Sequence, residues 1–300
     1  MDAMRVVLAA DGSEPTRAAE RLIDALCRRD RLEFSALSVA ALGPSSLERL
    51  GHPDLAAAFL ADHAEFLGDR SPQSLAELYL AYRCVVRAKV AAICWTQGTR
   101  AAQGALGQAR GLLRMALQHL ERATVRLVLV GGLPGSGKST LAGALADRHG
   151  WCLLRSDVVR RELCGEEAEP AGYGQGRYAT EATERTYAEL LRRSEMMLVL
   201  GETVLLDASW SRRARREEAA RVAARASAQL VEIELAVPSQ EAAARLRQRA
   251  GTEDASEATP EVLAHMAADA QAWPSAARLD AAQPPAAVLK LAEAVLSHAR

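Results

Sequence analysis

Aromatic residues, lysine and cysteine are scarce in this chain. Aromatic residues make up 4% of the 300 residues, so aliphatic side chains must fill the hydrophobic cores, and the apolar fraction of 49% is sufficient for this. Lysine occurs only at Lys89, Lys138 and Lys290. The five cysteines include no Cys-x-x-Cys pair, which argues against a disulfide framework or a zinc site and indicates a reducing, cytoplasmic environment.

Other absences exclude further classes of protein. No apolar run reaches the ~18 residues of a membrane span, and the residues after Met1 lack the pattern of a secretory signal. We therefore expect no interaction with a membrane. The formal net charge is −1, so no overall basic field attracts nucleic acid. The six histidines form no pair at metal-ligand spacing.

A glycine-rich segment carries the strongest functional signal. Residues 132–140 read Gly-Leu-Pro-Gly-Ser-Gly-Lys-Ser-Thr, which fits the phosphate-binding pattern G-x-x-x-x-G-K-[ST]. An apolar run at 125–130 precedes the segment and a helical pattern follows it, as the motif requires. We expect the loop amides and Lys138 to hold the phosphates of ATP, and the Ser139 hydroxyl to bind Mg²⁺. The predicted nucleotide-binding residues are Gly132, Gly135, Ser136, Gly137, Lys138, Ser139 and Thr140.

Strand and helix patterns alternate from residue 123 onward. Strands are predicted at 125–131, 151–155, 203–207, 230–236 and 277–279. Helices are predicted at 138–149, 157–164, 179–200, 211–227, 239–249, 260–271 and 286–297. This alternation is typical of an α/β fold with a parallel sheet flanked by helices. The patterns between 54 and 122 are helical, which predicts a smaller, mostly helical N-terminal region.

Charged residues follow the predicted strands at their carboxyl ends, where α/β folds place their ligands. Asp157 and Arg160 are three residues apart on a first helical turn. They can therefore face one cleft, where Asp157 would deprotonate an acceptor hydroxyl and Arg160 would stabilise a transferring phosphoryl group. An ordinary helix cap is the alternative for Asp157.

Asp207 ends the third predicted strand, at a position where an acid binds Mg²⁺, although Asp is also common in simple turns. The next residue is Ala208, not the glutamate that activates water in motor ATPases. This favours transfer to an acceptor over hydrolysis.

Arginines gather near two predicted helix ends. Arg245, Arg247 and Arg249 precede a small, polar loop at 251–256, and Arg245 or Arg249 would stabilise phosphoryl-transfer charge from a lid. A solvated helix face is an equally good interpretation of these residues, and the better one for the arginines at 212–216.

Three segments together resemble the P-loop kinases related to polynucleotide kinase, zeta toxin and chloramphenicol phosphotransferase, which are often described as AAA family ATPases. They are residues 131–140, the Arg-Ser-Asp-Val-Val-Arg run at 155–160 and the Leu-Leu-Asp-Ala-Ser run at 205–209. The resemblance covers residues 123–300 and implies a P-loop kinase fold, Asp157 as the general base and a lid arginine near Arg245–Arg249. It implies no particular acceptor, because members of this group accept very different hydroxyls.

Two weaker resemblances divide the N-terminal region. Residues 4–42, with Val-Val-Leu-Ala-Ala-Asp-Gly-Ser-Glu at 6–14, resemble the start of a universal stress protein. Residues 51–120, through 67–69 and 78–90, resemble the tail of an aminoglycoside-phosphotransferase-like domain whose catalytic H-x-D-x-x-x-x-N segment is absent here. We expect three parts, at 1–50, 51–122 and 123–300, with catalysis confined to the third.

The sequence thus predicts an ATP- and Mg²⁺-dependent phosphotransferase that acts on a hydroxyl of a small molecule or of a nucleic-acid 5′ end. The predicted catalytic residues are Lys138, Asp157, Arg160, Arg245 and Arg249, and the predicted metal ligands are Ser139 and Asp207. Two alternatives remain open. One is an ATPase that couples hydrolysis to a conformational change, and the other is an ATP-binding, stress-type regulator without transfer.

Overall fold

The computed structural model describes residues 44–97, 104–165, 179–249 and 259–298. The chain separates into two compact units, one up to Ala123 and one from Thr124 onward. The stress-protein resemblance at 4–42 lies outside the described residues. Among those residues, no helix is both long and apolar enough to cross a membrane.

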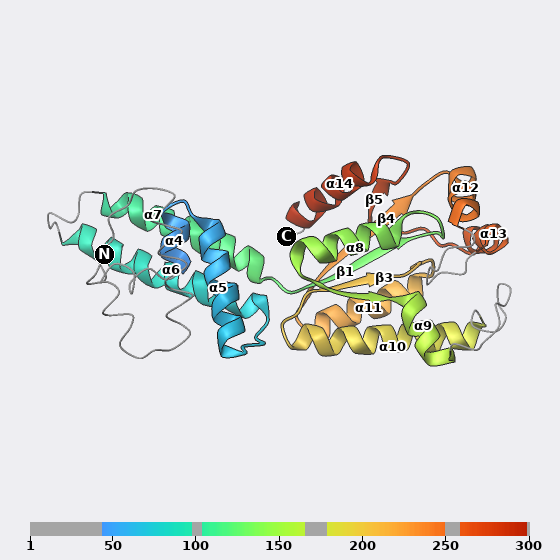
Figure 1. The fold of residues 1–300 in the computed structure, drawn as a ribbon, viewed down its shortest axis with the longest axis horizontal. Helices are drawn as coiled ribbons and strands as arrows, with labels where there is room; N and C mark the ends of the chain where they lie inside the picture. Colours follow the sequence, from blue (N-terminus) through green and yellow to red (C-terminus); the bar gives the residue numbers. More distant parts are fainter. Residues whose placement is uncertain (1–43, 98–103, 166–178, 250–258, 299–300) are drawn as a thin grey trace. The chain divides into compact units, whose positions relative to one another are not determined.

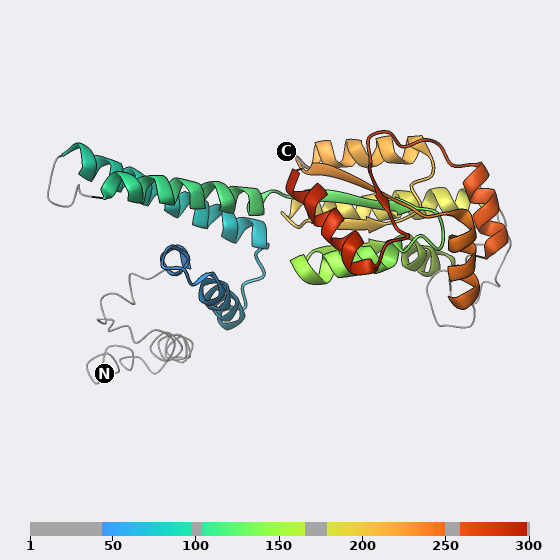
Figure 2. The same cartoon turned by 90° about the horizontal axis from the view of Figure 1, so that it is seen from above.

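The first unit is helical in its described part, as expected. Its helices are α4 (Pro44–Arg49), α5 (Pro53–Leu67), α6 (Gln73–Thr96) and α7 (Ala105–Ala123). Helices α6 and α7 lie side by side (Figure 2) and bury small and aliphatic side chains between them, among them Cys84, Ala88, Leu112 and Ala116.

A buried polar cluster joins three of these helices. The ring of His119 on α7 is fully buried, with Nδ1 2.7 Å from Glu77 Oε2 on α6 and Nε2 2.8 Å from Glu48 Oε2 on α4. Because an unpaired carboxylate is costly to bury, the imidazole holds both glutamates in place.

The second unit is built on a five-stranded, wholly parallel sheet with the order β2-β3-β1-β4-β5. The strands are β1 (Arg126–Gly132), β2 (Cys152–Arg155), β3 (Val204–Asp207), β4 (Gln229–Ala236) and β5 (Ala277–Asp280). The central strand β1 is buried along almost its whole length, as expected for an apolar run with a helix layer on each face.

Helices cover both faces of this sheet (Figure 1). Helices α8 (Lys138–His149) and α14 (Pro285–His298) form a core with one face. Helices α9 (Ser156–Cys164), α10 (Thr180–Val199) and α11 (Arg213–Arg225) form a core with the other face. Helices α12 (Ser239–Arg249) and α13 (Pro260–Ala268) follow β4 and pack against each other through Leu246 and Leu263. The predicted α/β fold with a parallel sheet flanked by helices is confirmed.

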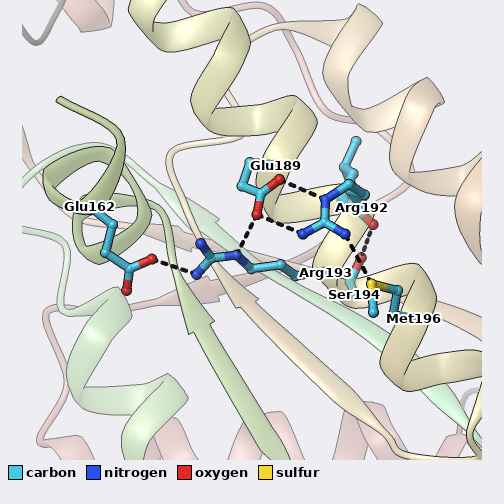
Figure 3. A network of polar contacts seen from close by, with 7 residues as sticks. Glu162, Glu189, Arg192, Arg193, Ser194 and Met196 are labelled. Atoms are coloured by element: carbon cyan, nitrogen blue, oxygen red, sulfur yellow. Dashed lines mark hydrogen bonds and ion pairs between the residues drawn. The ribbon is translucent and has the colours of Figure 1, made fainter.

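A network of ion pairs ties α9 to α10 on the outside of this unit (Figure 3). Glu189 accepts hydrogen bonds from Arg192 and Arg193, and Arg193 also donates to Glu162 on α9. The hydrogen bonds from Arg192 and Arg193 lower the pKa of Glu189 to about 2.

Candidate active site

The glycine-rich loop joins β1 to α8 and packs closely against its surroundings. At Gly132 a Cβ would lie 2.6 Å from the Leu235 carbonyl oxygen, and at Gly135, where φ is +78°, it would lie 2.6 Å from the Ala242 carbonyl oxygen. Both positions therefore require glycine. The Lys138 ammonium folds back over the loop and donates to the Leu133 carbonyl, at 3.0 Å.

The two predicted metal ligands are in direct contact. Ser139 lies in the first turn of α8, Asp207 ends β3, and the Ser139 hydroxyl donates to Asp207 Oδ2 at 2.6 Å. Burial raises the pKa of Asp207, an effect that nearby Lys138 and the Ser139 hydrogen bond oppose. A hydroxyl and a carboxylate are the hard oxygen donors that Mg²⁺ prefers, so this pair fits the ion.

Arg155 belongs to the same cluster, although the sequence analysis assigned it no role. It ends β2 and lies directly opposite Asp207 in the sheet register. Its Nε is 3.4 Å from Asp207 Oδ2, and its Nη2 donates to the Ser139 hydroxyl at 3.3 Å. A cation at the carboxyl end of a predicted strand was the signal available in the sequence.

Asp157 and Arg160 lie in the first turn of α9 and pair with each other. Arg160 Nη1 donates to Asp157 Oδ1 at 2.6 Å, and the Arg160 side chain is almost entirely buried. Both residues line the main cavity of the unit. The N-cap position of α9 is Arg155, so Asp157 lies inside the helix rather than at its cap.

That cavity has a volume of about 510 Å³ and gathers residues from several segments. Its walls include Asp157 and Arg160 of α9 and Asp207 at the end of β3. The glycine loop and α8 contribute Gly135, Gly137, Lys138, Ser139 and Thr140. Gly132 and Ser136 line adjoining hollows instead. Most of the predicted site residues thus surround one cavity.

The arginines of α12 separate in the structure. Arg245 lines the cavity and is held by Glu241 Oε1 at 2.6 Å and the Ala281 carbonyl at 2.8 Å. Arg247 points into solvent. Arg249 is the last residue of α12, and its side chain lies outside the described part of the chain, as does the 251–256 loop.

Another wall of the cavity contains arginines that the sequence analysis assigned to a solvated helix face. Arg212 and Arg215, at the start of α11, line the cavity together with Glu184 and Tyr187 of α10. The Tyr187 hydroxyl lies 3.0 Å from Ser209 Oγ, next to the end of β3. The sequence favoured a solvated face for these arginines, because four arginines within five residues give no sign of which ones turn inward.

A second cavity of about 430 Å³ adjoins the first on the α8–α14 side of the sheet. It shares Gly137, Thr140 and Arg245 with the main cavity, and its other walls include Leu141, Ala144, Val288 and Leu289. This second cavity is predominantly apolar.

Residues 127–273 match the family described as an AAA domain. An uncharacterized protein of Mycobacterium tuberculosis (strain ATCC 25618 / H37Rv) is 40% identical over 267 residues, which are 88% of this chain and 53% of that protein. An uncharacterized protein of Mycobacterium bovis (strain ATCC BAA-935 / AF2122/97) matches to the same extent. The chain therefore spans about half the length of the curated relatives it matches.

The solved structures that this chain matches include two kinases. A sugar kinase from Janibacter sp. HTCC2649 is 21% identical with a TM-score of 0.45, and the match covers 58% of this chain and 95% of that one. A gluconokinase from Sinorhizobium meliloti 1021 is 20% identical with a TM-score of 0.44, and the match covers 57% of this chain and 91% of that one. On its sequence match, its glycine loop and its parallel sheet, the segment 127–273 belongs to the AAA domain family and forms a P-loop domain.

Proposed function

We propose that this chain is an ATP-dependent phosphotransferase that moves the γ-phosphate of ATP to a hydroxyl group of an acceptor. One observation carries the proposal: a single cavity joins Lys138 and Ser139 of the phosphate-binding loop to Asp157 and Arg160. Phosphoryl transfer needs little more than this, because it depends on positioning the reactants and on neutralising charge.

The residues divide into a nucleotide side and an acceptor side. The loop amides and Lys138 would hold the phosphates, and Ser139 and Asp207 would hold Mg²⁺. When bound, Mg²⁺ neutralises charge on the β- and γ-phosphates. The apolar cavity beside Gly137 and Thr140 suits a flat, weakly polar adenine ring, and Arg245 lies where both cavities meet.

The acceptor side centres on Asp157. Its carboxylate would take the proton of the acceptor hydroxyl, while Arg160, which it now holds at 2.6 Å, would turn toward the transferring phosphoryl group. Arg245 or Arg249 would add further positive charge. Ala208 supports transfer over hydrolysis, because its small side chain is buried in the core next to Asp207 and cannot activate water.

Asp157→Asn tests the proposed base. ADP production from Mg²⁺-ATP is measured with a panel of hydroxyl acceptors, and nucleotide affinity is measured separately by calorimetry. We expect acceptor-dependent turnover to fall by about 10²–10⁴-fold while nucleotide affinity changes little. Asp147→Asn, at an exposed position on α8, is the matched control and should leave both measurements unchanged.

Two outcomes would count against the proposal. High ADP production without any acceptor would indicate an ATPase. Full acceptor-dependent turnover in the Asp157→Asn variant would remove Asp157 from the role of base.

A further inference from the structure

The structure sorts the four arginines at the start of α11 by role. Arg213 points away from the cavity, with a side chain that is 78% exposed and pairs with Glu217 on the same helix. Arg216 donates to the main-chain carbonyls of Gln271 and Ala272, so it holds the loop before β5. Only Arg212 and Arg215 of this group line the main cavity.

Arg215 is held in a way that suits ligand binding. Its guanidinium group lies 4.2 Å from the centre of the Tyr187 ring, and its side chain is only 12% exposed. Nη2 donates to Glu184 at 2.8 Å, and Nε is buried without a hydrogen-bond partner in the described part of the chain. The aromatic ring thus fixes the planar guanidinium group, which uses one of its N–H donors within the described part of the chain.

The charge of Arg215 is only partly balanced. The Glu184 side chain is 60% exposed, so water screens its interaction with the guanidinium group. Arg212 adds a second positive charge on the same wall, and its Nη2 lies 3.8 Å from Asp269 Oδ2. A nearly buried cation of this kind is stabilised when an anion binds to it.

The cavity wall that contains Arg215 lies away from the cavity assigned to the adenine base. Arg215 and Tyr187 come from α11 and α10, which cover the sheet face opposite α8 and α14. The apolar cavity assigned to adenine lies on the α8–α14 side, with the phosphate-binding loop between the two. Arg215 therefore lies at the acceptor end of the site.

We infer that the acceptor is a small hydroxy compound that carries an anionic group, either a carboxylate or a phosphate monoester, bound by Arg215 and Arg212. This inference rests on the proposed phosphotransferase function. The cavity of about 510 Å³ must hold the reacting phosphates as well, which leaves room for a monosaccharide-sized acceptor. Asp157 would face the hydroxyl while the two arginines hold the anion, so the acceptor is fixed at two points.

The test uses three sugars that differ in their charged group: glucose, gluconate and glucose 6-phosphate. The full chain is assayed for ADP production from Mg²⁺-ATP with each of them and with a 5′-hydroxyl oligonucleotide. We expect kcat/KM for at least one anionic sugar to exceed that for glucose by about 10- to 100-fold, as a charge-assisted hydrogen-bond pair provides. Arg215→Gln should remove this preference and leave the KM for ATP within twofold, and Arg215→Lys should restore part of it. Arg213→Gln is the matched control and should behave as the unaltered chain.

A binding measurement keeps the inference testable without turnover. With Mg²⁺ and a non-hydrolysable ATP analogue occupying the phosphate-binding loop, the preferred anionic sugar should raise Tm by about 2–4 °C, and glucose should not. Arg215→Gln should abolish the rise, and Arg213→Gln should retain it.

The outcomes separate the two proposals. Equal use of glucose and its anionic counterparts, or no effect of Arg215→Gln on either measurement, would refute the anion site and leave phosphotransfer standing. A Tm rise that requires Arg215, with no acceptor-dependent ADP production, would support the anion site and contradict phosphotransfer. A response to the oligonucleotide alone, or no Tm rise with either anion, would refute the anion site.

Discussion

Two glycines of the phosphate-binding loop look alike in sequence but should respond differently to alanine. Gly135 and Gly137 both have positive φ angles, of +78° and +88°. A Cβ at Gly137 would meet nothing within 4 Å, whereas a Cβ at Gly135 would lie 2.6 Å from the backbone oxygen of Ala242 on α12. Gly137→Ala thus tests backbone strain alone, and Gly135→Ala tests strain together with a clash.

The expected magnitudes follow from these two terms. A left-handed conformation costs an alanine about 1–2 kcal/mol, which is the whole effect expected at Gly137. Because the atom opposite Gly135 belongs to the backbone, α12 or the loop must shift, at a further cost of about 1–3 kcal/mol. We therefore expect Gly135→Ala to destabilise the second unit by about 2–5 kcal/mol. Gly143→Ala, inside α8 and facing open space, should instead stabilise this unit by about 0.5–1 kcal/mol.

The assay is urea unfolding, monitored by tryptophan fluorescence. The four tryptophans are Trp95, Trp151, Trp210 and Trp273. In a Trp95→Phe background, the remaining three all report on the unit that begins at Thr124. If Gly135→Ala and Gly137→Ala destabilise this unit equally, within about 0.5 kcal/mol, then the close packing of the loop against α12 is wrong.

Two further predictions concern polar clusters away from the active site. Glu189→Gln should reduce stability at pH 7 by no more than about 1 kcal/mol, because the Arg192 side chain is largely exposed and that of Arg193 is partly exposed. Since the pKa of Glu189 is lowered to about 2 in the folded chain, this contribution is complete above about pH 4.5. It should disappear as pH falls toward 2, so the difference between the two urea midpoints should close over that range; a difference that stays constant would contradict the role of the network. In the N-terminal unit, His119→Leu should cost about 3–5 kcal/mol, because it leaves Glu48 and Glu77 facing each other with the half-exposed Arg122, at 3.5 and 3.9 Å, as their remaining ion-pair partner among the described residues. Thermal unfolding followed by circular dichroism measures this cost, and a loss below about 1 kcal/mol would show that the glutamates do not depend on the ring.

The sequence was most informative where local pattern and chemistry coincide. The glycine loop, Asp157 and Asp207 each follow an apolar strand, and parallel strands bring their carboxyl ends to one edge of the sheet. The sequence therefore predicts that these residues line one cavity.

The sequence did not predict which side chains point into the site. Arg155 joins the Ser139–Asp207 pair only because β2 lies beside β3, and sequence order does not fix which strands are neighbours. Arg215 turns inward because Tyr187 offers it a ring from another helix, 28 residues earlier in the chain. Both contacts depend on tertiary packing.

The apolar stripe of α6 shows that the sequence also did not predict which face of this helix is buried. Leu78, Tyr79, Tyr82, Val86 and Val90 recur at helical spacing, which ordinarily marks a buried face. In the structure these side chains are exposed, and α6 packs on α7 through its smaller residues, such as Cys84 and Ala88. Periodicity identified the helix and did not identify the face that it buries.

The strand order β2-β3-β1 also sets a sequence of events during synthesis. Strands β1 and β2 emerge from the ribosome early, but the space between them is filled only by β3, after residues 156–203 have been made. At about 5–20 residues per second, that interval lasts about 2–10 s. Throughout it, the phosphate-binding loop and Asp157 exist without Asp207, and both strands keep an unpaired edge. During this interval the nascent chain carries an incomplete site and two strands with unpaired edges. A chaperone or another β-strand can bind to these edges until β3 is made.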